Sequence, residues 1–171
     1  LLDAYTLRRE WGSLEGKQVL IFGDVRHSRV ARSNFDLLSK LGATVGVCGP
    51  EAMMPLPEQM PGVRVFESLD EALPWADACM GLRIQLERHA TKDLDVSAAS
   101  EYHARYGLNP QRLDLLGPDA LILHPGPINH GLEFSPEVIQ DGRSRVLAQV
   151  GNGGVIRAAL LSLILGLEVG T

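Results

Sequence analysis

The chain has 171 residues, of which 45% are hydrophobic and 22% are charged, which is ordinary for one globular domain and excludes disordered and collagen-like classes. The net charge of −5 argues against general nucleic-acid binding, which needs a basic face, but it allows a local basic pocket. No apolar run approaches the ~18 residues of a membrane span, and no signal segment opens the chain, so we expect no membrane contact.

Two cysteines, Cys48 and Cys79, lie in apolar runs without the paired cysteines or histidines of a zinc site. They are expected to be buried free thiols in a reducing cytoplasm, with a disulfide as the alternative. The five histidines are scattered, so no metal site is predicted, and we expect no cofactor.

The first predicted element is a helix over residues 1–11 that ends at Gly12. No residue suited to a helix N-cap precedes it. We therefore expect that this helix begins upstream, in a longer parent protein.

A β-α-β unit follows. The apolar run 18–22 predicts a buried parallel strand that ends at Gly23, residues 28–41 show helical spacing up to Gly42, and residues 43–48 predict the next strand. Such units cross over right-handed and form parallel sheet.

The rest of the chain repeats this alternation. In order, we predict a surface connection (53–61), a short strand (63–66), a short helix capped by Ser68 with Glu71 in the N3 position, a strand (77–82), a polar mobile loop running into a short helix (86–107), a strand (121–123) and an apolar helix (154–167). The predicted fold is α/β, a single domain over residues 1–171. It is an open, doubly wound (Rossmann-like) parallel sheet of about five strands with helices on both faces.

Ligands of such sheets bind beyond the carboxyl ends of the strands, which selects three loops. In the first, Asp24 to Arg29, a helix N-terminus coincides with a cluster of arginines that includes Arg26, Arg29 and Arg32. Arginine's planar fork suits a carboxylate, so an anion site is one interpretation and a solvated helix start is the other. The loop lacks GxGxxG, which disfavours a dinucleotide-binding domain.

The second loop places Arg83 at the carboxyl end of a strand. Arg83 and Gln85 alternate with Ile84, so on extended backbone they point to one side and could clamp a carboxylate. A surface arginine or a structural ion pair is the alternative.

The third loop, His124 to Gly131, has two prolines around Gly126, and this stiff backbone could present carbonyls to a ligand. A structural turn is the alternative. Further on, the glycines of 149–154 predict a tight turn into the last helix, with Arg157 on its first turn. A structural use is expected for Arg157, and pairing with Asp24 across the core is one form that it could take. No hydrolytic triad is present.

Together these loops resemble the aspartate carbamoyltransferase family, specifically its second, aspartate-binding domain. The resemblance spans nearly the whole chain and rests on four ordered motifs: GDVRHSRVARSN, LRIQLER, LHPGPINHG and QVGNGGVIRAALL. It implies two α/β domains with an active site shared between subunits of a homotrimer. The implied reaction joins carbamoyl phosphate to L-aspartate, giving N-carbamoyl-L-aspartate and phosphate in pyrimidine (UMP) synthesis.

The resemblance also assigns roles. Arg29 would bind one aspartate carboxylate and Arg83 with Gln85 the other, with their order left open. Gly126 and Pro127 would lie against the carbamoyl group.

Asp24 and Arg157 would be structural supports of the Arg29 loop. The carbamoyl-phosphate domain is expected upstream of residue 1, together with the catalytic acid and base, so the 171 residues alone are predicted to be inactive. Regulatory or dihydroorotase partners are compatible with the resemblance.

Two rivals stay open. An ornithine-type carbamoyltransferase typically has an HCLP-like turn where this chain has HPGP, and its cationic substrate would favour acidic residues near Arg83. A non-catalytic pseudoenzyme domain would be expected to lose Arg29 or Arg83, and both are retained.

Overall fold

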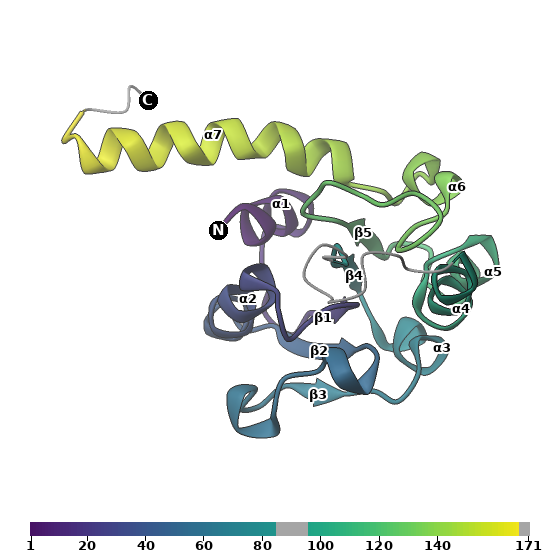
Figure 1. Cartoon of the computed structure of the whole chain (residues 1–171). Coiled ribbons are helices and arrows are strands. Elements are labelled where there is room, and N and C mark those ends of the chain that lie inside the picture. Colours follow the sequence, from purple (N-terminus) through teal and green to yellow (C-terminus); the bar gives the residue numbers. More distant parts are fainter. Residues whose placement is uncertain (85–95, 168–171) are drawn as a thin grey trace.

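The computed structural model describes residues 1–84 and 96–167. One five-stranded sheet forms its centre, with every pair of neighbouring strands parallel and the order β3-β2-β1-β4-β5 (Figure 1). The strands are β1 (Gln18–Phe22), β2 (Thr44–Cys48), β3 (Arg64–Val65), β4 (Ala78–Gly81) and β5 (Leu121–Leu123). The predicted doubly wound α/β fold is confirmed, and each predicted strand is present with its ends moved by one residue at most.

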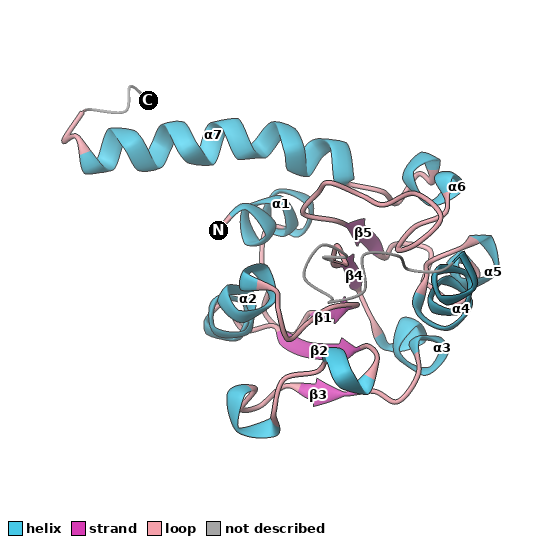
Figure 2. Ribbon diagram, in the orientation of Figure 1, coloured by secondary structure: helices cyan, strands magenta, loops and turns pink. Residues whose placement is uncertain are grey.

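Helices cover both faces of the sheet, as Figure 2 shows. They are α1 (Leu2–Trp11), α2 (Arg29–Lys40), α3 (Leu69–Ala72), α4 (Val96–Tyr106), α5 (Pro110–Leu113), α6 (Pro136–Gln140) and α7 (Val146–Ile164), with 3₁₀ turns at Glu51–Met53, Pro57–Gln59 and Leu73–Trp75. The expected Ser68 cap is present, because its Oγ accepts from the Glu71 N–H at 3.2 Å.

Strand side chains alternate between two cores. Val19 and Ile21 of β1 face α1 and α2, where they pack with Leu7 and Leu38. Leu20 and Phe22 of the same strand face the opposite layer with other buried residues such as Phe134. This alternation is what a pleated strand buried on both faces requires, and it explains why the strands are continuous apolar runs in the sequence.

The last helix corrects a prediction. Helix α7 begins at Val146, eight residues before the predicted start, so the glycines of 149–154 lie inside it and Arg157 lies in its middle. Each helical glycine costs about 1 kcal/mol relative to alanine. Contacts with α1 offset this cost, since Gln149 donates to Asp3 at 2.6 Å and Asn152 donates to Thr6 at 3.0 Å.

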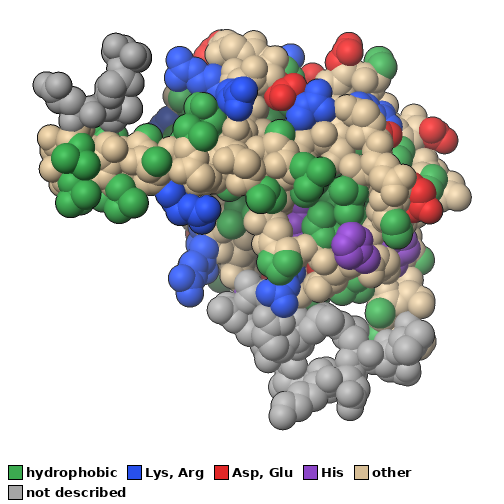
Figure 3. All heavy atoms as spheres, turned by 90° about the horizontal axis from the view of Figure 1, so that it is seen from above, with side chains coloured by type: hydrophobic (Ala, Val, Ile, Leu, Met, Phe, Trp, Pro, Cys, Tyr) green, Lys and Arg blue, Asp and Glu red, His purple; other side chains and the backbone are tan. Residues whose placement is uncertain are grey.

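Most of α7 projects from the domain with apolar side chains exposed (Figure 3). Leu147, Leu163 and Ile164 are 75%, 72% and 78% exposed. By length and composition alone α7 could cross a membrane, with a mean hydropathy of 1.4, but a single helix of this kind is weak evidence. The sequence analysis predicted no segment of this length because it placed the start of the helix at residue 154 instead of Val146.

Candidate functional site

The site lies at the point in the sheet where the order of the strands reverses, between β1 and β4. The chain proceeds from β1 to β2 and β3 on one side, and then to β4 and β5 on the other, so the loops after β1 and β4 diverge at their carboxyl ends. This divergence creates a crevice in open α/β sheets. A hollow of about 300 Å³ opens there, lined by His27, Ser28, Arg29, Val30, Leu82, Arg83, Pro125, Gly126 and Pro127. The structure therefore brings together all three loops that were selected from the sequence.

The loop after β1 is built around a buried carboxylate. Asp24 is 1% exposed, and its Oδ1 accepts from the His27 backbone N–H at 3.3 Å and lies 2.8 Å from His27 Nδ1. Ser28 then caps α2, because its Oγ accepts from the Ala31 N–H at 3.1 Å. Arg29 follows as the first residue of α2, with its side chain exposed at the hollow. The loop is therefore folded by Asp24 and presents Arg29 at a helix N-terminus, where anions are favoured.

The loop after β4 delivers Arg83 to the same hollow. Leu82 and Ile84 on either side of it are each 1% exposed, while Arg83 is half-buried and lines the hollow. Two buried neighbours leave the arginine side chain directed away from the core. Gln85, its predicted companion, lies outside the described residues, as does the first part of the predicted loop 86–107.

The third loop is a turn stabilised from within. His124 is completely buried, and its Nδ1 accepts from the Gly126 N–H at 3.0 Å. Its own backbone N–H donates to Gln149 Oε1 of α7 at 3.0 Å. Gly126 has a φ of 68°, and its bond to Pro127 is cis. The Gly126 N–H is therefore occupied within the turn, and the exposed Pro127 faces the hollow.

A buried carboxylate that the sequence did not reveal joins the second and third loops. Glu133 is 1% exposed, and it accepts from the Ile84 N–H at 2.8 Å and from the Asn129 N–H at 2.6 Å. Asn129 Nδ2 also donates to Glu133 at 2.8 Å. One glutamate and one asparagine after a proline turn give no pattern in the sequence that distinguishes them from surface residues.

Burial shifts two titrations in opposite directions. It lowers the pKa of His124 to about 4, so the ring is neutral at pH 7. Because Nδ1 is an acceptor, the ring proton is on Nε2, which lies 4.0 Å from Glu133 Oε2. Burial raises the pKa of Glu133, and the hydrogen bonds that it accepts partly oppose this rise. His124 therefore serves the turn as a neutral acceptor.

The predicted pairing of Asp24 with Arg157 is wrong. Asp24 is buried beside His27, whereas Arg157 is exposed in the middle of α7, and across residues 1–84 and 96–167 no ion pair joins them. The physical reason is the longer α7, which moves Arg157 along a projecting helix, away from a helix start near the sheet.

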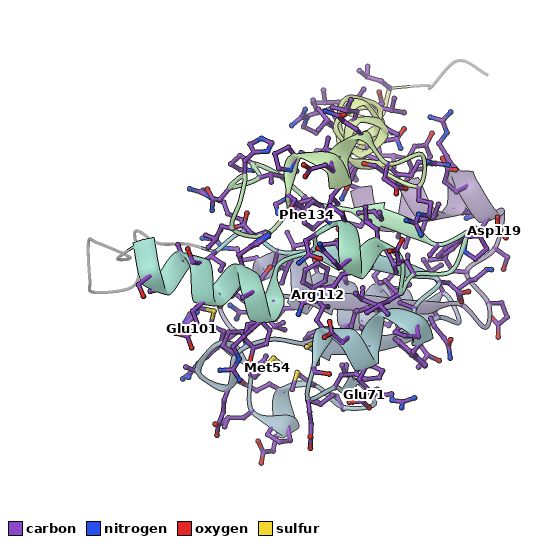
Figure 4. All side chains as sticks on the ribbon, turned by 90° about the vertical axis from the view of Figure 1, so that its right-hand side faces the viewer. Met54, Glu71, Glu101, Arg112, Asp119 and Phe134 are labelled. Atoms are coloured by element: carbon purple, nitrogen blue, oxygen red, sulfur yellow. The ribbon has the colours of Figure 1, made fainter. Side chains whose placement is uncertain are left out.

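A larger hollow, of about 790 Å³, lies at the opposite end of the sheet. Asp119 and Arg143 are among its lining residues. In Figure 4 Asp119 lies at the right-hand edge of the molecule, whereas Met54, whose loop adjoins the β1 loop, lies left of its centre. Both arginines that line this larger hollow are held in ion pairs, Arg143 with Asp141 at 2.9 Å and Arg145 with Glu10 at 2.8 Å. We therefore place the site at the smaller hollow, which is lined by Arg29 and Arg83 and lies at the switch point.

Neither cysteine lines the hollow. Cys48 and Cys79 are free and fully buried, as predicted, and burial raises their thiol pKa values to about 11 and about 12. In the described portion of the chain, no three histidine, cysteine or acidic side chains gather as metal ligands would.

These features define an α/β domain of the doubly wound class with a cationic hollow at its switch point. The sequence pattern of the family described as "Aspartate/ornithine carbamoyltransferase, Asp/Orn binding domain" matches residues 15–164. The chain belongs to this family.

Curated relatives that are similar in sequence carry the description of one of the two enzymes in the family's name. The chain is 49% identical over 163 residues to the aspartate carbamoyltransferase catalytic subunit of Myxococcus xanthus, covering 95% of this chain and 54% of that protein. It is 48% identical over 172 residues to the protein of the same description from Chlorobium phaeovibrioides, covering 97% and 55%. The chain thus spans about half the length of the curated relatives it matches.

Solved structures share the fold. Aspartate transcarbamoylase from Trypanosoma cruzi superposes with a TM-score of 0.79 at 24% identity, over 94% of this chain and 54% of that one. Ornithine carbamoyltransferase from Pyrococcus furiosus gives 0.79 at 24%, over 98% and 56%. The fold alone therefore does not choose between the two substrates, whereas the relatives that are close in sequence carry the aspartate description.

Proposed function

We propose that this chain is the aspartate-binding half of an aspartate carbamoyltransferase, acting in pyrimidine (UMP) synthesis. One observation carries the proposal: Arg29, Arg83 and the Gly126–Pro127 turn, from three separate loops, line a single hollow at the switch point. The names of the relatives that are about half identical support aspartate over ornithine.

The proposed roles are those that the family resemblance implies, and the positive charge and the position of the two arginines support them. Arg29 binds one carboxylate of L-aspartate at the start of α2, and Arg83, with Gln85, binds the other. Gly126 and Pro127 contact the carbamoyl group of carbamoyl phosphate. Asp24 supports the first loop through His27.

In the proposed reaction, the main task of these residues is to orient the substrates. The aspartate amine attacks the carbonyl carbon of carbamoyl phosphate, a C–N bond forms, the C–O bond to phosphate breaks, and the amine loses a proton. The substrate is itself the nucleophile, so its two carboxylates must be held while its nitrogen approaches the carbamoyl carbon. Such positioning can supply several kcal/mol of the rate acceleration, roughly 7–11 in the best intramolecular cases.

A preceding domain completes the proposed enzyme. It would supply the phosphate site and the catalytic acid and base, and it accounts for the other half of the relatives' length. It would also cover the exposed apolar surface of α7 (Figure 3), which lies beside the N-terminus (Figure 1). Arg157 in the middle of α7 fits a protein interface better than a lipid-facing span. We further propose a cytoplasmic homotrimer of such chains.

Substrate choice tests the proposal. The complete polypeptide is expected to use L-aspartate and to release one phosphate for each carbamoyl-aspartate formed. The same assay with ornithine is the control. Turnover with ornithine and none with aspartate would reject the proposed function.

The assigned clamp gives a second test. Loss of one charge-assisted carboxylate contact costs about 1.5–3 kcal/mol, so Arg83→Ala should weaken aspartate use by roughly 10- to 100-fold in KM. The KM for carbamoyl phosphate should change by less than about 3-fold, because Arg83 is not assigned to that substrate. Arg64→Ala, at an exposed arginine of β3, is the matched control. Equal losses for both substrates would contradict the assigned role.

A further inference from the structure

Ile84, which in the sequence stands between Arg83 and Gln85, has both of its backbone polar groups held by side chains of one neighbouring segment. Its N–H donates to Glu133 Oε1 at 2.8 Å, and its carbonyl accepts from Asn129 Nδ2 at 3.3 Å. Its own side chain is 1% exposed. Beyond the end of β4, these two bonds take the place of a ladder partner. They fix the backbone from which Arg83 departs.

Glu133 is itself held in one orientation. Its Oε1 also accepts from Asn129 Nδ2 at 2.8 Å, and its Oε2 accepts from the Asn129 N–H at 2.6 Å. Its backbone carbonyl accepts from the Leu108 N–H at 2.8 Å. Both carboxylate oxygens are therefore used as acceptors, although burying a carboxylate is costly and raises its pKa. Only a side chain with two acceptor oxygens satisfies all three donors.

We propose that Glu133 and Asn129 are positioning residues that set the direction of Arg83, and with it the affinity for aspartate. The inference rests on the proposed function, since it names the part of that same site which orients the substrate's carboxylate. Neither residue lines the hollow, so both would act through the backbone of Ile84.

The effect should fall on aspartate more than on carbamoyl phosphate. The Gly126–Pro127 turn has supports of its own, the bond from the Gly126 N–H to His124 and the bond from the His124 N–H to Gln149. For the Ile84 backbone, within the described part of the chain, the bonds to Glu133 and Asn129 are the ones seen. Weakening the unit formed by Glu133 and Asn129 should therefore loosen the loop that carries Arg83 before it loosens the Gly126–Pro127 turn.

Two substitutions perturb this unit to different degrees. Glu133→Gln keeps the shape but replaces one acceptor oxygen by an NH₂ donor, so at least one of the three donors then faces another donor. Asn129→Ala is milder, because it removes the side-chain bonds to the Ile84 carbonyl and to Glu133 but leaves the bond from the Ile84 N–H to Glu133. Glu137→Gln, at an exposed position four residues on, is the matched control.

The experiment measures steady-state kinetics of the complete enzyme with each substrate varied in turn, for the wild type, the control and both variants. We expect Glu133→Gln to raise the KM for aspartate about 10-fold or more, and Asn129→Ala about 3-fold, with carbamoyl phosphate changed less than about 3-fold. The double variant should fall short of the product of the single effects, because both act on one unit.

Three results would overturn the inference. The first is a KM for aspartate within 2-fold of the control in both variants, in a wild type that uses aspartate. The second is an equal loss for both substrates, which would indicate general destabilisation. The third, a wild type with no aspartate use, would overturn the proposed function and this inference with it. If Glu133→Gln fails to fold, Asn129→Ala alone decides between the first outcome and the expected one.

Discussion

Gln149 should be among the most sensitive polar positions of the domain, although it lies on the helix that projects most. It is 1% exposed and connects two elements, accepting from the His124 N–H at 3.0 Å and donating to Asp3 Oδ1 at 2.6 Å. Asp3 also accepts from Asn34 of α2 at 2.7 Å. One amide therefore joins α1, α7 and the turn that carries Gly126.

Replacing Gln149 by leucine keeps the approximate size and removes both bonds. It strands the buried His124 N–H and leaves Asp3 with one fewer donor, and each such loss costs about 1–3 kcal/mol. Leucine has no polar amide to bury, and this offsets part of the cost of the two lost bonds. We therefore expect a net loss of about 2–4 kcal/mol in the free energy of unfolding. For a chain of this length that corresponds to a fall in Tm of roughly 5–15 °C.

Urea denaturation followed by the fluorescence of Trp11 and Trp75 measures this change. Gln140→Leu, at the exposed end of α6, is the control and should stay within about 0.5 kcal/mol of the wild type. If Gln149→Leu lost no more than the control, the inference that this amide joins the three elements would be refuted.

Two further predictions use the same denaturation assay. Gly81→Ala should destabilise the domain by about 1–3 kcal/mol, because the new Cβ would lie 2.5 Å from the buried ring of Phe134, whereas Gly117→Ala, in open space, should be nearly neutral. As pH falls from 6.5 to about 4, the unfolded chain protonates His124 before the folded chain does, so the wild type should lose roughly 3 kcal/mol from this group. His124→Asn retains an acceptor for the Gly126 N–H and does not titrate. The difference between its free energy of unfolding and that of the wild type should therefore shrink as the pH falls over that range. A constant difference would contradict the assignment of this pH dependence to His124.

Much of the fold could be predicted because its determinants are local. The runs 19–22 and 121–123 are apolar without interruption, and the β-α-β order then fixes parallel pairing and the ligand edge. Arg29 and Arg83 could be found for the same reason, since one lies at the start of a helix and the other just after a strand, and both boundaries are visible in the sequence. The family resemblance supplied the substrate, which no periodicity could.

The failures were non-local. The glycines of 149–154 indicate a turn by local propensity, but contacts of Gln149 and Asn152 with α1, more than 140 residues away, keep that segment helical. The role of Glu133 could not be predicted from the sequence, because it depends on a hydrogen bond from the Ile84 N–H, 49 residues away in the chain. A buried polar residue looks like a surface residue until its partner is known.

The three loops that line the hollow share one solution to a common physical problem. Where a strand ends, its ladder ends, and the next N–H of a buried segment still requires an acceptor. Here a buried side chain supplies it each time: Asp24 for His27, Glu133 for Ile84, and Gln149 for His124. Side chains that bond to backbone fix a loop without adding another strand at the ligand edge. The sheet edge can therefore stay open to a small anion while the residues around it are held in place.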